Sequence, residues 1–325
     1  MYFNKIKILT FFKELINEAY KTSFILFKIM IPVSILVKVL QEADLIKYIG
    51  YILQPLMKLA GLPGEMGLVW ATGMISNLYG GLLCFLTLSP KYDLTIAQVT
   101  VLTLMMLVAH TFPIELFVAR KAGVRLSVMF TIRFGFGLLM GILLNFIYKS
   151  FNYLQTKSTI KLISIHEQGS TIKIWILGEL KNYLYIFIAI LILILLMKIL
   201  KQLGIIKLIN NILGPVVRII GISKDVIPIT IIGLTLGVSY GGAMIIKETE
   251  NKSINKKDIF YSLVLMGLCH SLIEDTLLIM SIGGDFFGIF IYRLIITLII
   301  LYFIVLITKK LPDKFIYKYL LIKKV

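Results

Sequence analysis

The sequence predicts an all-α integral membrane protein, because its composition is far more apolar than that of a soluble domain and its two halves repeat one order of segments. Hydrophobic residues make up 58% of the 325 residues, and the mean hydropathy is +0.93. Soluble domains use roughly 45–50% apolar residues. Residues 22–40, 183–203 and 286–308 form apolar runs, each long enough to cross about 30 Å of hydrocarbon as a helix. A multi-pass protein of the cell membrane follows.

The basic charge of the chain lies between the apolar runs. The formal net charge is +17, and Lys and Arg next to spans hold loops on the cytoplasmic side. We therefore expect cytoplasmic N- and C-termini. Nucleic-acid binding would need basic clusters on a folded surface, so the lipid bilayer is an expected partner and nucleic acid is not.

An internal repeat appears when the chain is shifted by 160 residues. Residues 44–61 then superpose on residues 204–221 with seven of 18 positions identical, including Pro55 on Pro215. Further matches keep nearly the same register, at an offset of 160 or 161: Tyr79, Gly80 and Gly81 on Tyr240, Gly241 and Gly242, His110 on His270, Glu115 on Asp275, and Arg133 on Arg293. The sequence therefore predicts two copies of one membrane unit, residues 22–148 and 183–308.

Each copy is predicted to contain the same parts in the same order. A long span comes first, then an interfacial helix with a mid-helix proline, an apolar stretch broken by Tyr-Gly-Gly, and two closing spans. In the first copy these parts are residues 22–40, 44–61, 66–88, 94–111 and 125–148. In the second they are residues 183–203, 204–221, 226–246, 259–278 and 286–308.

The stretch around Tyr-Gly-Gly is either a full span or a re-entrant hairpin, and its length allows both. Gly-Gly at membrane depth frees backbone groups that lipid cannot satisfy, which favours a hairpin tip buried in protein or facing a wet cavity. The number of Lys and Arg residues on each side of the membrane also slightly favours hairpins. Hairpins leave three crossings per copy, an odd number, so the two copies would be inverted.

Three segments lie outside the repeats. Residues 1–21 are expected to form an amphipathic helix on the membrane surface, and residues 309–325 a basic tail. Residues 149–182 are expected to be a linker. Within it, apolar and polar residues alternate over residues 159–165 and 171–176, a pattern typical of a small β-hairpin. His166 is expected to have no role.

The order of segments resembles the core of the concentrative nucleoside transporters. With Pro55, Tyr79-Gly80-Gly81 and His110 in one copy and Pro215, Tyr240-Gly241-Gly242 and His270 in the other, the chain more closely resembles the nucleoside-recognition Gate domain family. That family includes the spore maturation proteins and the membrane domains of the ferrous-iron transporter B proteins. The resemblance implies a transport-type membrane protein for a nucleoside or similar small polar solute. No phosphate-binding loop of the iron transporters' motor part occurs in the sequence.

Ionisable side chains at membrane depth cost about 2.5–3.5 kcal/mol each and mark functional sites or buried pairs. Pro113 is expected to break or kink the helix between His110 and Glu115. The expected substrate-binding residues are Asn77, Tyr79, Gly80, Gly81, His110, Thr111, Glu115, Ser239, Tyr240, Gly241, Gly242, His270, Ser271, Glu274 and Asp275. Glu274 is expected to share a helix face with His270, and Arg133 and Arg293 to form structural ion pairs. Alternatively, the histidines and acidic side chains only pair with one another, or with Arg133 and Arg293, and bind no solute.

Two other functions stay open at this point. A divalent-metal pathway is the first, because Cys84 and Cys269 add soft ligands to the histidines and carboxylates; a scaffold without transport is the second. No catalytic residue, cofactor or dedicated metal site is expected, since residues 110–115 lack the His-Glu-x-x-His arrangement of zinc hydrolases. A homo-oligomer is neither predicted nor excluded.

Overall fold

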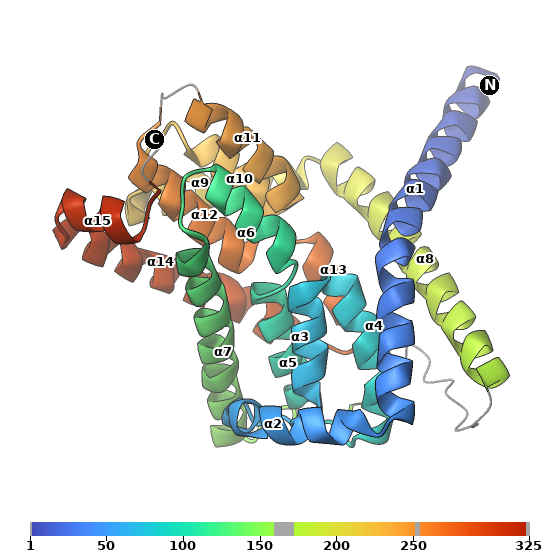
Figure 1. Ribbon diagram of the computed structural model, residues 1–325. Helices are drawn as coiled ribbons and strands as arrows, with labels where there is room; N and C mark the ends of the chain where they lie inside the picture. The colour runs from blue at the N-terminus through green and yellow to red at the C-terminus, as the bar shows by residue number, and fades with distance from the viewer. Residues whose placement is uncertain (1, 159–171, 251–253, 323–325) are drawn as a thin grey trace.

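The computed structural model describes residues 2–158, 172–250 and 254–322, and in these ranges the backbone is helical apart from turns and two isolated bridges. Figure 1 shows the first and second halves of the chain packed side by side. The first half contains helices α1 (Tyr2–Glu42), α2 (Leu45–Leu59), α3 (Met66–Ile75), α4 (Leu78–Leu88), α5 (Ile96–Val108), α6 (Phe112–Lys121) and α7 (Leu126–Ser150). The second contains α8 (Ile172–Gln202), α9 (Ile205–Ile220), α10 (Ile227–Leu236), α11 (Val238–Glu250), α12 (Lys256–Cys269), α13 (Glu274–Met280), α14 (Arg293–Lys310) and α15 (Asp313–Tyr319).

Six helical segments in the described ranges are long and apolar enough to span a membrane, as predicted. They are α1 from Thr10, α5 with α6, α7, α8, α12 with α13, and the segment Phe287–Lys310. The segments α5–α6 and α12–α13 are 72% buried, whereas the other four are 17–39% buried. The two broken spans therefore form the centre of the molecule, and the unbroken spans present apolar side chains at its surface.

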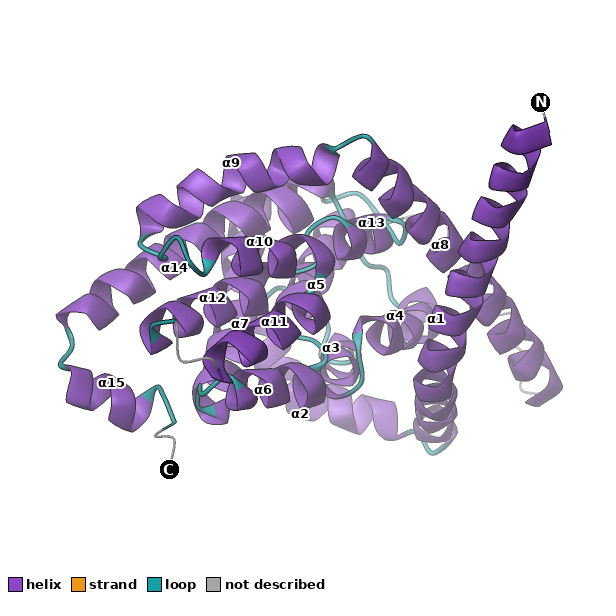
Figure 2. Ribbon diagram, turned by 90° about the horizontal axis from the view of Figure 1, so that it is seen from above, coloured by secondary structure: helices purple, strands orange, loops and turns teal. Residues whose placement is uncertain are grey.

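Helices α2 and α9 are the amphipathic elements expected after the first span of each half. Figure 1 shows α2 lying across the lower end of α1, α3 and α7. In Figure 2, seen from above, α9 is near the viewer and α2 is far away. The two amphipathic helices therefore lie at opposite ends of the molecule. Pro55 and Pro215 lie inside them.

Helices α3 and α4 fold back on each other as a tight pair, and α10 and α11 do the same. A methyl group added to Gly81 would lie 3.0 Å from the Cα atom of Gly73, and one added to Gly241 would lie 2.5 Å from the Cα atom of Gly233. Residues eight apart on one straight helix would be about 12 Å from each other. Each pair is thus a helical hairpin held together by facing glycines.

The hairpin turns precede the Tyr-Gly-Gly motifs, which corrects the expected position of the break. The first turn lies at Ser76 and Asn77, and the second at Gly237, whose φ is +94°. Helix α4 runs unbroken through Gly80 and Gly81. The glycines serve close helix packing rather than backbone exposure.

Two expectations for the flanking segments are wrong. Helix α1 is continuous from Tyr2 to Glu42, so residues 2–21 extend the first span instead of forming a separate surface helix. Helix α8 begins at Ile172, so residues 172–176 are helical and not a strand. The short alternation there is overridden by the long apolar run that follows it. Residues 159–171, with His166, lie outside the described ranges.

Candidate solute and ion site

The two central spans break at similar points, directly after the helices α5 and α12. The backbone leaves the helix at Ala109–Thr111 and at His270–Ser271, where Thr111 and Ser271 have φ values of +51° and +45°. Left-handed backbone at such residues costs of order 1–3 kcal/mol and is kept where the surroundings enforce it. Pro113 lies in the first turn of α6, just after the first break.

The hairpins satisfy backbone amides freed at these breaks. The amide of Thr111 donates to the carbonyl of Gly73 in α3 at 3.0 Å, and the amide of Leu272 donates to the carbonyl of Leu234 in α10 at 2.8 Å. Irregular backbone at membrane depth is tolerated where protein covers it. Each hairpin therefore stabilises the break in its own half.

Arg133 binds carbonyls at the ends of both broken helices. Its Nε donates to the carbonyl of Val108 in α5 at 3.0 Å and to that of Gly267 in α12 at 2.9 Å. Its Nη1 lies 2.7 Å from Oε2 of Glu115. The guanidinium thus lies at the negative ends of two helix dipoles and also forms an ion pair with Glu115.

Arg293 makes the same kind of contacts from the other half. Its Nε donates to the carbonyl of Leu268 at 3.1 Å, and its Nη2 to those of Leu107 and His270 at 3.2 and 3.1 Å. No ion pair of Arg293 occurs among the described residues. Carbonyl capping, not an ion pair, therefore fixes this arginine, and the two arginines join the halves.

The imidazoles of His110 and His270 face each other at the centre. Their ring centroids are 4.8 Å apart, and their Nε2 atoms are 3.1 Å apart. Each Nδ1 lies 2.9 Å from a backbone carbonyl of the preceding helix, that of Met106 or of Met266. The histidines are 5% and 4% exposed, so they are buried in protein.

Two carboxylates approach the histidine pair. Oε1 of Glu115 lies 3.7 Å from Nε2 of His110 and 3.4 Å from Nε2 of His270. Oδ2 of Asp275 lies 3.8 Å from Nε2 of His110 and has no hydrogen-bond partner among the described residues. We call His110, His270, Glu115, Asp275, Arg133 and Arg293 the polar centre.

Glu274 is not the acid closest to His270. The expected shared face required a continuous helix, but α12 ends at Cys269 and α13 begins at Glu274. Glu115, from the other half of the chain, lies nearer to the histidine instead. Helix spacing fails as a guide here because the chain turns between the two residues.

The predicted site residues of the two hairpins have different surroundings in the structure. Tyr79 lies within electrostatic reach of Glu274 and Asp275. Asn77 caps α4, its Oδ1 accepting a hydrogen bond from the amide of Gly80 at 2.8 Å. A methyl group on Gly242 would meet Val118 of α6, so α11 packs on the opposite half. The side chains of Ser239 and Tyr240 lie outside the described part of the structure.

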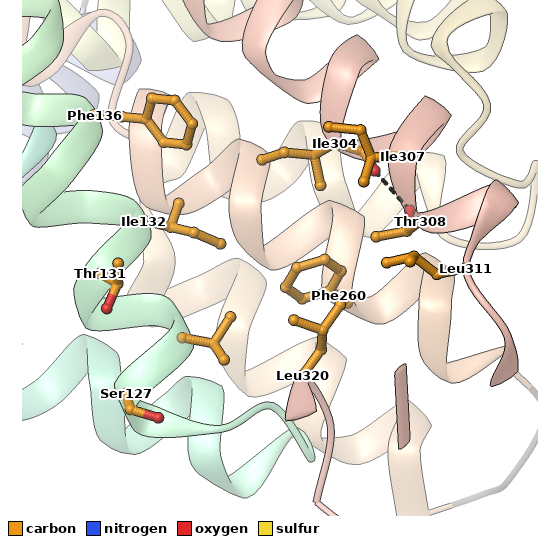
Figure 3. A pocket seen from close by; sticks show the side chains of 11 residues that line it. Ser127, Thr131, Ile132, Phe136, Phe260, Ile304, Ile307, Thr308, Leu311 and Leu320 are labelled. Carbon is orange, nitrogen blue, oxygen red and sulfur yellow. Dashed lines mark hydrogen bonds between the residues drawn. The ribbon is translucent and has the colours of Figure 1, made fainter. Parts of the chain in front are cut away.

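An open apolar groove lies away from the polar centre. It has a volume of about 390 Å³ and is lined mainly by apolar side chains of α7 and α14. Figure 3 shows Ile132 and Phe136 facing Ile304 and Ile307 across it. No residue of the polar centre lines it, and its apolar walls do not suit a polar solute.

One buried polar group was missed in the sequence. Glu179 is 4% exposed and Asn182 is 5% exposed, although both lie on the long apolar helix α8. Ser34 of α1 and Asn182 lie beside the Glu179 carboxyl group. The signal in the sequence is a charged residue at the start of an apolar run, and it lies in residues 149–182, which are predicted to be a linker.

The comparisons with known proteins agree with this architecture. Residues 23–125 match the Gate family model, described as nucleoside recognition. This part of the chain is similar to a Gate domain. The match covers the C-terminal half of α1 and all of α2 to α6, and so includes His110, Thr111 and Glu115.

The chain is also a distant homologue of a bacterial membrane protein. It is 28% identical over 272 residues to the uncharacterized membrane protein YvoD of Bacillus subtilis (strain 168), covering 81% of this chain and 84% of the relative. No solved structure matches the chain. The segment that resembles a Gate domain therefore belongs to a multi-pass membrane protein.

Proposed function

We propose that this chain is a membrane transport protein that carries a small polar solute or ion through the polar centre. The main support for this proposal is that two broken helices end at one buried cluster of histidine, carboxylate and guanidinium groups. Discontinuous helices at membrane depth are the usual means of building solute and ion sites in transporters. Ionisable groups buried there mark substrate or ion pathways by default.

The proposal includes two inverted copies of one unit. It is supported by the equivalent breaks at His110 and His270, by the helical hairpin in each half, and by the placement of α2 and α9 at opposite ends of the molecule. With cytoplasmic termini, α2 would lie on the outer face and α9 on the inner face. The hairpins would then enter the membrane from opposite sides and re-emerge on the side of entry.

The family description points to a nucleoside-like solute. The Gate match is described as nucleoside recognition, and Tyr79 and Asn77 of the first hairpin are polar groups near its turn. Both histidines are buried, so a solute of this size would need a movement of the hairpins to reach them. A single ion would need a smaller movement, which keeps a divalent-cation pathway as the second candidate.

Uptake into proteoliposomes tests the proposal. Wild-type protein, His270→Asn, Glu115→Gln and the control His166→Ala are reconstituted, and uptake of radiolabelled nucleosides, nucleobases and divalent cations is measured. We expect one solute class to enter with wild type and the control, and not with His270→Asn or Glu115→Gln. Equal uptake of that class by all four proteins would remove the polar centre from the pathway. No uptake of any class, with one partner protein bound stably, would favour the scaffold.

A further inference from the structure

The hydrogen bonds of the two histidines fix where their protons lie. A backbone carbonyl can only accept, so the Nδ1 atoms that contact Met106 and Met266 must each carry a hydrogen. A neutral imidazole with Nδ1–H has a bare lone pair on Nε2. When both rings are neutral, the two Nε2 atoms, 3.1 Å apart, present lone pair to lone pair.

Two buried acceptors facing each other are unfavourable unless something positive lies between them. The third acceptor nearby is Oε1 of Glu115, 3.4 and 3.7 Å from the two nitrogens. A triangle with these sides contains a point about 2.0 Å from all three atoms, which is the distance of Zn²⁺ from imidazole nitrogen and carboxylate oxygen. The three atoms are spaced as ligands of one cation.

The surroundings hold each of these ligands in place. The Nδ1–H groups are anchored on carbonyls, which fixes the tautomer and ring orientation, as in known metal sites. Arg133 binds Oε2 of Glu115 and leaves Oε1 directed at the histidines. The cluster is buried and comes from α6 and the two helix breaks, not from surface loops.

The local charge allows a cation. Arg133 and Arg293 bring two positive charges, and Glu115, Glu274 and Asp275 can bring three negative ones. Asp275 also leaves Oδ2 buried without a hydrogen-bond partner among the described residues, 3.8 Å from Nε2 of His110. This oxygen is the candidate for a fourth ligand.

We propose that His110, His270 and Glu115 bind one divalent first-row transition-metal cation. Two imidazoles and a carboxylate suit zinc, iron, cobalt or nickel, whereas calcium and magnesium prefer all-oxygen sites. Within the described residues, Cys84 and Cys269 are not part of this cluster. The inference rests on the proposed function in taking the polar centre as the site of the solute or coupling ion, but metal binding is measured without transport.

Titration of Co²⁺ into the purified full-length protein tests the site. The protein is treated with chelator in detergent, and the visible absorption of bound Co²⁺ and its displacement by Zn²⁺ are followed. His110→Asn and His270→Asn keep an N–H donor for the helix carbonyl and remove the Nε2 ligand. His166→Ala and the double variant Cys84→Ala/Cys269→Ala are matched controls. Elution volume and melting temperature report folding.

We expect one Co²⁺ per wild-type chain and unchanged binding in both controls. Each histidine variant should lose more affinity than the about 10–100-fold that follows loss of an outer-shell partner. If a histidine variant does not fold, Glu115→Gln replaces it, with a loss of affinity again expected. No saturable binding to wild type, or equal binding to the histidine variants, would overturn the site.

Comparison with the uptake assay separates this inference from the proposed function. Saturable binding that needs both histidines, without uptake of any solute, supports the metal site and contradicts transport. Nucleoside uptake that is unchanged by chelator and by His110→Asn contradicts the metal site and leaves transport standing.

Discussion

Nε2 of His110 and Nε2 of His270 meet at 3.1 Å, although 160 residues separate the two histidines in the chain. Each histidine follows a helix that stops inside a broken apolar span, and each half supplies a hairpin that stabilises its own break. The arginines bind carbonyls of both halves around the pair. The halves therefore meet through polar groups at the centre of an otherwise apolar protein.

Arg133→Ala should strongly destabilise the protein. The change removes two hydrogen bonds to helix carbonyls and leaves the Glu115 carboxylate buried without its ion pair. Breaking a buried pair in this way costs about 3–5 kcal/mol of the free energy of unfolding. The melting temperature in detergent measures it. Arg120→Ala, at an exposed position of α6, is the control and should change stability by less than about 0.5 kcal/mol. Equal melting temperatures for the two variants would show that the guanidinium is dispensable.

Gly81→Ala should loosen the first hairpin. The added methyl group would lie 2.7 Å from the end of Met106 and 3.0 Å from the Cα atom of Gly73, and the second contact can be relieved only by moving backbone. Overpacking of this kind costs about 1–3 kcal/mol. Gly135→Ala in α7 meets no atom within 4 Å and should instead stabilise by up to about 1 kcal/mol. The melting temperatures of both variants test this prediction. A higher melting temperature for Gly81→Ala than for wild type would argue against the tight hairpin.

Labelling from the two sides of the membrane should show α2 and α9 on opposite faces. Lys58 and Arg218 are exposed and occupy matching positions on these helices. In a background without Cys84 and Cys269, Lys58→Cys should react with an impermeant maleimide added outside intact cells. Arg218→Cys should react only after the cells are opened. Reaction of both from one side would exclude inverted halves.

Hydropathy was sufficient to predict the spans and the amphipathic helices. The six long apolar helices were predicted because burial in lipid demands about 20 apolar residues, and α2 and α9 begin and end within two residues of their expected bounds. The surface helix over residues 1–21 was wrong, because scattered lysines do not prevent a helix from continuing into a span. The hairpin turns were misplaced because Gly80 and Gly81 also suit close packing inside a helix.

The candidate site was predictable as a set of residues but not as an arrangement. The predicted repeat aligns His110 with His270, and their expected position inside apolar spans marked them as candidates. Their direct contact depends on how two distant segments pack, which no local pattern encodes. The role of Arg293 was missed for the same reason, since carbonyls at a helix end become ligands only where the helix is seen to stop. Glu179 was missed because its helix was expected to begin later.

The most direct test of the account is ligand stabilisation of the native protein. Melting temperatures of wild type, His110→Asn and His166→Ala are measured in detergent with nucleosides, nucleobases and divalent cations. A ligand that binds only the folded state at 100 times its dissociation constant adds about 2.7 kcal/mol of stability. We predict that one class stabilises wild type and His166→Ala but not His110→Asn. Equal stabilisation of all three proteins, or of none by any ligand, would contradict a binding site at the polar centre.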